Sequence, residues 1–195
     1  MQWLLPLLAL PLAPAGPELT FTPVAQSFAA ASGEYRSLWC GEGARIMAEM
    51  ERVTGFPYPG GRVEVFVTNS APMTAFGGGR MSLKASYPTY YKRATLVHEL
   101  GHRLAFTVPR TADLDEHRLL YLFLYDVWDA LYGREFADGM VAIERRIAGR
   151  YDYAGAWDWA LAMSRAERQA RLADLRKAAG GTPSDTHPLR TPGCA

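Results

Sequence analysis

Alternating apolar and polar positions mark one segment of the chain as a β-strand. In RVEVFVT, residues 62–68, every second position from Val63 to Val67 is a valine, and Glu64 and Phe66 lie between them. A period of two places the valines on one face, as in a strand with one buried side. We therefore predict a strand over residues 62–68.

Two other regions have β character. The mixed segment PELTFTPVAQSF, residues 17–28, is predicted to be extended. Short β-prone pieces flank Gly77-Gly78-Gly79 and favour a hairpin or a bulged edge strand. A phosphate-binding loop is not favoured, because neither the Lys-Ser/Thr of a P-loop nor a complete G-x-G-x-x-G follows.

Apolar residues recur with helical spacing through the rest of the chain. Pro109 and Gly133 are expected to end two of the helices, and Ser164-x-x-Glu167 is a capping box at the start of the last one. The predicted helices cover residues 34–54, 91–106, 113–132, about 139–149 and 164–179. Because a helix and strands precede a run of helices, we predict an α+β fold with a small mixed sheet and a helical C-terminal half.

The first 15 residues differ from the remainder. MQWLLPLLALPLAPA has an apolar run followed by Ala13-Pro14-Ala15, which is typical of a signal peptide although no Lys or Arg precedes it. We therefore predict a secreted or periplasmic protein that begins near Gly16 and has no stable membrane association after cleavage. A mis-assigned start or a packed N-terminal helix is the alternative.

The same compartment would let Cys40 and Cys194 form a disulfide, which we favour slightly over two free thiols. Residues 16–180 are predicted to form one domain. Residues 181–195, GTPSDTHPLRTPGCA, are predicted to form a turn-rich tail.

Composition narrows the classes of partner. The net charge is +1, and the arginines form no basic stripe with interleaved aromatic residues. Binding to nucleic acid is therefore not supported.

The chemically informative segment is LVHELGHRLA, residues 96–105. His98 and His102 are four residues apart, so a helix places both on one face, where two imidazoles can hold one metal ion. Glu99 lies beside that face and can accept a proton without binding the metal. Two of the chain's four histidines are in this motif.

This His-Glu-x-x-His helix resembles that of the zincin metallopeptidases. The metzincin branch has a third His six residues after the second, behind a Gly; here these positions are Val108 and Ala105, which excludes that branch. The resemblance to the gluzincin branch covers roughly residues 34–132. It implies one zinc ion held by His98, His102 and a Glu of the next helix, for which Glu116 is the candidate.

Other assignments for the third ligand stay open. His117 would give a three-histidine site, and Asp113 would match the aspartate-ligated zincins, whose further motifs are missing. Glu116 could instead close a capping box with Asp113. The chain also departs from the gluzincin pattern at Leu120, where a carboxylate that orients a ligand His is expected, so the orienting group is unassigned.

The resemblance further implies that an edge strand around Arg80–Lys84 holds an extended peptide. It also implies that a Tyr assists the oxyanion, with Tyr151 and Tyr153 as candidates; packing against Trp157 and Trp159 is the alternative for either one.

The expected function is a secreted zinc metallopeptidase. It would hydrolyse peptide or protein substrates through a zinc-activated water, with Glu99 as the general base. A non-catalytic peptide- or protein-binding module on a zincin scaffold, and a zinc hydrolase of a non-peptide amide, are the alternatives.

Overall fold

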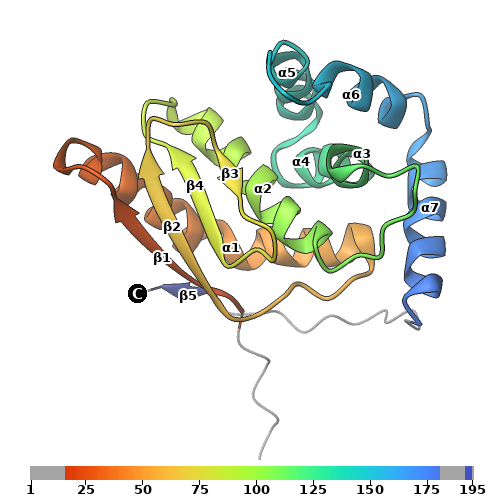
Figure 1. Ribbon diagram of the computed structural model, residues 1–195, viewed down its shortest axis with the longest axis horizontal. Coiled ribbons are helices and arrows are strands. Elements are labelled where there is room, and N and C mark those ends of the chain that lie inside the picture. The colour runs from red at the N-terminus through yellow and green to blue at the C-terminus, as the bar shows by residue number, and fades with distance from the viewer. Residues whose placement is uncertain (1–15, 181–191, 195) are drawn as a thin grey trace, which may run out of the picture.

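The computed structural model describes residues 16–180 and 192–194 (Figure 1). The expected signal peptide and most of the expected C-terminal tail lie outside the described residues. No helix in the described part of the chain is long and apolar enough to cross a membrane.

A small mixed sheet forms one side of the molecule. Its strands lie in the order β3-β4-β2-β1-β5. Strands β1, β2, β4 and β5 are parallel to their neighbours in this part of the sheet, and β3 pairs antiparallel to β4. The bounds are Glu18–Pro23 for β1, Arg62–Thr68 for β2, Met73–Thr74 for β3, Arg80–Lys84 for β4 and Gly193–Cys194 for β5.

The sheet buries one face. The valines predicted to lie on one side of β2 are at most 1% exposed, whereas Glu64 on the other side is exposed. Helices α1 (Ala29–Thr54), which follows the short 3-10 turn η1 (Gln26–Phe28), and α2 (Thr89–Ala105) contact the sheet. They lie behind the strands in Figure 1, between the sheet and the remaining helices. The prediction of an α+β fold is confirmed.

The C-terminal half is helical, on the side of α2 away from β1 (Figure 1). The single helix predicted over residues 113–132 is divided into two helices, α3 and α4, because the backbone leaves helical geometry at Phe123 (φ −130°, ψ −22°). The capping box at Ser164 is confirmed, and a helix from Tyr153 was not predicted. The bounds are Glu116–Tyr121 for α3, Leu124–Tyr132 for α4, Arg134–Glu144 for α5, Tyr153–Leu161 for α6 and Arg165–Ala178 for α7.

Gly101 allows α2 and the α3–α4 junction to approach closely. A Cβ atom at this position would lie 2.6 Å from Cδ1 of Leu120 and 3.5 Å from Cε2 of Phe123. Both side chains are fully buried. The absence of a side chain at Gly101 therefore brings the start of the helical half against the middle of the His-Glu-x-x-His helix.

The prediction that residues Arg80–Lys84 form an edge strand of the sheet is wrong. Strand β4, Arg80–Lys84, lies between β2 and β3, so its backbone is paired on both sides. The edge nearest the His-Glu-x-x-His helix is β3, and Thr74 of β3 donates a hydrogen bond to Glu99. The turn at Gly77-Gly78 folds the chain back and makes β3 the outer strand. Of the two structures predicted for this segment, a hairpin or a bulged edge strand, the hairpin is the one observed.

Cys40 is disulfide-bonded. Cys194 is the other cysteine of the chain and belongs to β5, which pairs with β1. Its side chain lies outside the described residues. The Trp39 indole donates a hydrogen bond to the Gly193 carbonyl oxygen at 3.1 Å, so α1 contacts β5 next to these cysteines.

Candidate metal centre

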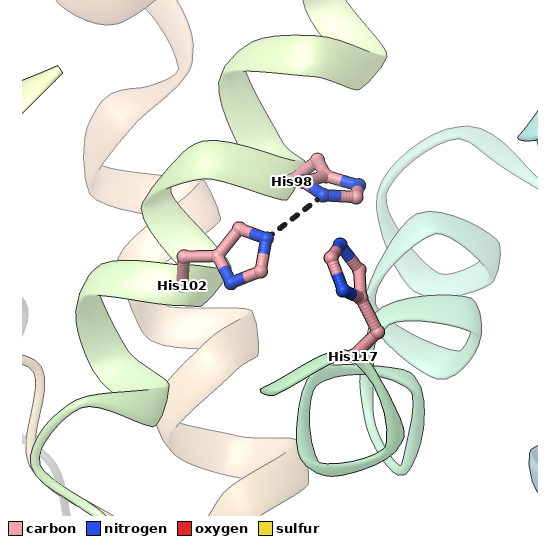
Figure 2. Close-up of side chains that lie close together, drawn as sticks. All are labelled: His98, His102 and His117. Atoms are coloured by element: carbon pink, nitrogen blue, oxygen red, sulfur yellow. Dashed lines mark hydrogen bonds between the residues drawn. The ribbon is translucent and has the colours of Figure 1, made fainter. Parts of the chain in front are cut away.

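Helix α2 presents His98 and His102 on its buried face. The helix is buried along most of its length, and the two side chains lie one turn apart. Their Nε2 atoms are 3.0 Å from each other. Figure 2 shows both rings turned toward the same point. Helical spacing therefore gives the pair of nitrogen donors expected from the sequence.

His117 of α3 completes a group of three. One ligand atom from each of His98, His102 and His117 lies within 4.8 Å of the others, and all three residues are buried. The His117 ring comes from a different helix and faces the other two across the gap between α2 and α3 (Figure 2). Three buried histidines in the described part of the chain thus lie close enough to bind one metal ion.

Glu116, the third ligand expected from the gluzincin resemblance, is not part of this group. Its Oε1 lies 3.2 Å from Nδ1 of His102, whereas His102 faces His98 with Nε2. The carboxylate thus lies at the opposite nitrogen of the ring, where it can orient His102. The two groups are close, but the contact is not aligned as a hydrogen bond.

The start of α3 explains why the side chains of Glu116 and His117 point in different directions. The helix begins at Glu116, and Asp115, not Asp113, is the N-cap, since it accepts a hydrogen bond from the Arg118 amide. The alternative role of Glu116, in a capping box with Asp113, is therefore wrong as well. Successive residues of a helix point about 100° apart, so His117 turns inward while the Glu116 side chain stays 27% exposed.

Asp113, the remaining alternative ligand, is exposed. It accepts a hydrogen bond from Thr111 and pairs with Arg171 of α7. These contacts direct it away from the three histidines.

Glu144 is a candidate site residue that the sequence analysis did not identify. It is 4% exposed at the end of α5, and its Oε1 lies 2.7 Å from Nδ1 of His98. Its Oε2 accepts hydrogen bonds from the Tyr121 hydroxyl at 2.9 Å and the Trp157 indole at 3.0 Å. Glu144 therefore supplies the orienting carboxylate that has no counterpart at Leu120.

A signal for Glu144 does exist in the sequence. The buried face of α5 carries Ala137, Met140 and Val141, and Glu144 continues that face at helical spacing. A carboxylate on an apolar helix face requires buried partners. The spacing alone names none of them, because Tyr121, Trp157 and His98 come from three other helices.

The electrostatics of the group favour neutral donor nitrogens at two of the histidines. Burial, and repulsion from His98, hold the pKa of His102 well below its usual range. The same two causes lower the pKa of His117 to about 4. Neutral imidazole is the form that binds a metal ion.

The pKa of His98 is shifted in the opposite direction from those of His102 and His117, because of Glu144. Burial works to lower the pKa of His98, but the charge and hydrogen bond of Glu144 outweigh it and raise the pKa. Burial likewise works to raise the pKa of Glu144, and His98 with the other donors brings it below its usual value. Glu144 is thus held in its charged form by hydrogen-bond donors on both oxygens.

Glu99 lies next to the histidines and is 4% exposed. The Thr74 hydroxyl is 2.7 Å from Glu99 Oε2 and 3.0 Å from the Glu99 carbonyl oxygen. Burial raises the pKa of the Glu99 carboxyl to about 7, although His98 and the Thr74 hydrogen bond oppose the change. A carboxyl with a pKa near neutrality suits a general base.

A cleft of about 280 Å³ exposes these groups to the surface. Edge strand β3 and the following loop form one wall, and the opposite wall includes Tyr151 and Tyr153. The His117 ring centre lies 4.7 Å from that of Tyr151 and 4.6 Å from that of Tyr153. The two tyrosines proposed from the sequence are therefore at the site.

The two tyrosines differ in environment. Burial is the main cause that raises the pKa of Tyr153 to about 12, whereas Tyr151 is 44% exposed. Trp157, the expected packing partner, stacks instead on Tyr121 at 3.7 Å between ring centres. Tyr153 therefore keeps a protonated hydroxyl beside the three histidines.

Comparison with protein-family models, curated proteins and solved structures finds no match. The resemblance to the zincins rests on the residues of this chain alone.

Proposed function

We propose that this protein is an exported zinc-dependent peptidase of zincin type, with His98, His102 and His117 as the metal ligands and Glu99 as the general base. The observation that carries the proposal is the convergence of three buried imidazoles on one point beside a buried glutamate, in a cleft open to the surface. The proposal replaces Glu116 by His117 in the ligand set.

The donor set fits zinc. Three imidazole nitrogens are a common zinc ligand set in catalytic sites, which leave one position open. Both histidines of α2 have a carboxylate near the other ring nitrogen: Glu144 is hydrogen-bonded to His98, whereas Glu116 lies 3.2 Å from Nδ1 of His102 without an aligned hydrogen bond. A hydrogen-bonded carboxylate in this place, as at His98, fixes the ring orientation and raises the basicity of a metal-binding histidine. When bound, zinc would supply Lewis acidity, which lowers the pKa of a water and polarises a substrate carbonyl.

Other parts of the chain would bind the peptide, transfer the proton and stabilise the charge on the carbonyl oxygen. The free edge of β3 can pair with an extended peptide and hold it across the cleft. Glu99 accepts a proton from the attacking water and passes it to the leaving amine. The Tyr153 hydroxyl donates a hydrogen bond to the carbonyl oxygen as charge develops there.

Thr74 connects the edge strand to the base. Its hydroxyl contacts both the carboxylate and the carbonyl oxygen of Glu99, so it ties β3 to the middle of α2. The strand that would hold the peptide and the carboxylate that would accept the proton are thereby held at a fixed separation.

The test combines metal content with hydrolysis. Purified mature protein, loaded with zinc and dialysed, is expected to hold one zinc ion per chain by elemental analysis. It should cleave peptides in a degenerate peptide pool, with products identified by mass spectrometry, and a chelator should abolish cleavage that zinc restores.

Each alternative gives a different result in the same test. One bound zinc with no cleavage of peptides or of small amides would favour the non-catalytic binding module. Hydrolysis of small amides alone would favour a hydrolase of non-peptide amides. A protein that binds no metal would overturn the proposal.

A further inference from the structure

A second cavity, of about 270 Å³, opens beside the proposed metal site. It shares Pro72, His98, Glu99 and Tyr153 with the cleft described above. Its other walls come from the end of β4, the first two turns of α2 and the segment after α5. A group bound in this cavity would therefore touch the residues that we propose to react.

Most polar groups in the wall already have partners. The Thr95 hydroxyl donates to the Tyr91 carbonyl oxygen at 2.8 Å, and Glu144 accepts hydrogen bonds on both oxygens. The rings of Tyr87 and Tyr91 lie 4.3 Å apart, and Ile147 forms part of the rim. An apolar side chain can enter this space without leaving those polar atoms unpaired.

Lys84 is different. Its Nζ lies 5.3 Å from the centre of the Tyr87 ring. Among the residues described by the structure, no carboxylate forms an ion pair with it. The cavity thus contains one positive charge without a negative partner, next to an apolar surface. An anionic group of a ligand would supply the missing partner.

The direction of β3 indicates which part of a peptide reaches Lys84. Residues 72–76 line the main cleft, and residues 71 and 72 line the second cavity. A peptide paired antiparallel to β3, the more stable arrangement, runs from the residue 76 end toward the residue 71 end. Its C-terminal side would then enter the second cavity.

We infer that Lys84 binds the free α-carboxylate of a peptide substrate, with the C-terminal side chain packed against Tyr87 and Tyr91. The inference rests on the proposed peptidase function and gives it a substrate class: peptides with a free C-terminus that end in a large uncharged residue. The cavity is slightly smaller than the roughly 300–1,000 Å³ of small-molecule sites, which suits one residue. Hydrolysis would consume one water and release that residue as a free amino acid.

The experiment compares two acetylated pentapeptides that end in Phe and differ only at the C-terminus, one a free acid and the other an amide. With the zinc-loaded full-length mature chain, kcat/KM for release of the last residue should be roughly 10–100-fold higher for the acid, the size expected of a hydrogen-bonded charge pair. Lys84→Met should bring the ratio toward one, and Lys84→Arg should keep most of it.

Lys177→Met is the matched control. Lys177 is 79% exposed on α7 and pairs with Asp174, away from the cavity, so the ratio should stay as in the wild type. Ile147→Asp is a second probe, because a carboxylate at the rim would compete for Lys84 and should also lower the ratio.

The outcomes separate the two proposals. Equal cleavage of acid and amide by the wild type, unchanged in Lys84→Met, would overturn the carboxylate site and leave the peptidase standing. No cleavage of either peptide or of the degenerate pool would overturn the peptidase, and the carboxylate site with it. An acid preference that Lys84→Met retains would assign it to another group.

Discussion

Oε1 of Glu144 lies 2.7 Å from Nδ1 of His98, although the two residues are 46 positions apart in the chain. This contact leaves Nε2 of His98 facing His102 and His117. A carboxylate at Nδ1 favours the tautomer with its proton on that nitrogen. Glu144 of α5 therefore determines which nitrogen of His98 would be free to bind a metal ion.

Glu144→Gln should change the tautomer balance of His98 and weaken zinc binding. The amide can still accept a hydrogen bond but carries no charge, so the loss of zinc affinity should be about 10-fold, within the 10–100-fold typical of such partners. Nitrogen-15 shifts of the His98 ring in metal-free protein report the tautomer, and competition with a chelator measures affinity. An unchanged tautomer and unchanged affinity together would contradict the role.

Glu144→Leu is the more severe variant. It leaves the Tyr121 hydroxyl and the Trp157 indole without their acceptor in a buried place. Two unpaired buried donors should cost about 2–6 kcal/mol of unfolding free energy. Urea unfolding of the metal-free protein measures this loss, which Glu144→Gln should largely avoid.

His117→Ala should abolish tight zinc binding, whereas Glu116→Ala should retain one zinc ion per chain with affinity lowered about 10-fold. The first change removes a donor of the three-histidine group, and the second removes only a contact to His102 Nδ1. Zinc stoichiometry of folded variants, checked by circular dichroism, separates them. The reverse pattern would restore the gluzincin ligand set.

Glu99→Gln should keep zinc but lose hydrolysis by about 10²–10⁴-fold or more, because the amide cannot accept the proton. The shape of the side chain is preserved, and the Thr74 hydroxyl can still donate to the amide oxygen. Zinc content and kcat on the same preparation test this. Wild-type turnover in the variant would refute Glu99 as the base.

Tyr153→Phe should lower kcat with little change in KM, since a hydrogen bond that strengthens as charge develops acts on the transition state. A loss of about 10-fold or more is expected. Tyr151→Phe is the control, because Tyr151 is 44% exposed and should contribute less. Equal effects of both variants would assign no special role to Tyr153.

Gly101→Ala should destabilise the fold. The new Cβ would meet the fully buried Leu120 at 2.6 Å, and such overpacking costs about 1–3 kcal/mol. Gly33→Ala in α1 is the matched control, since nothing lies within 4 Å of its Cβ position and alanine favours a helix by about 0.5–1 kcal/mol. Urea unfolding of metal-free protein compares them. A Gly101 variant as stable as the wild type would show that Leu120 can shift freely.

The sequence by itself determined the local features of this protein. The alternation of valines identified β2, and helical spacing identified α1, α2 and α7 with its capping box. It also placed His98 and His102 on one face of a helix, with Glu99 beside them. These features depend on residues a few positions apart, whose relative directions are set by the backbone geometry of one element.

Only the tertiary structure decided how the candidate metal site is completed. Whether Glu116 or His117 turns inward depends on the residue at which α3 begins and on how α3 approaches Gly101. The partner of His98 comes from α5, and the true edge strand depends on how the glycine turn folds β3 onto β4. These are packing relationships between distant segments, and the periodicity of one segment carries no information about them.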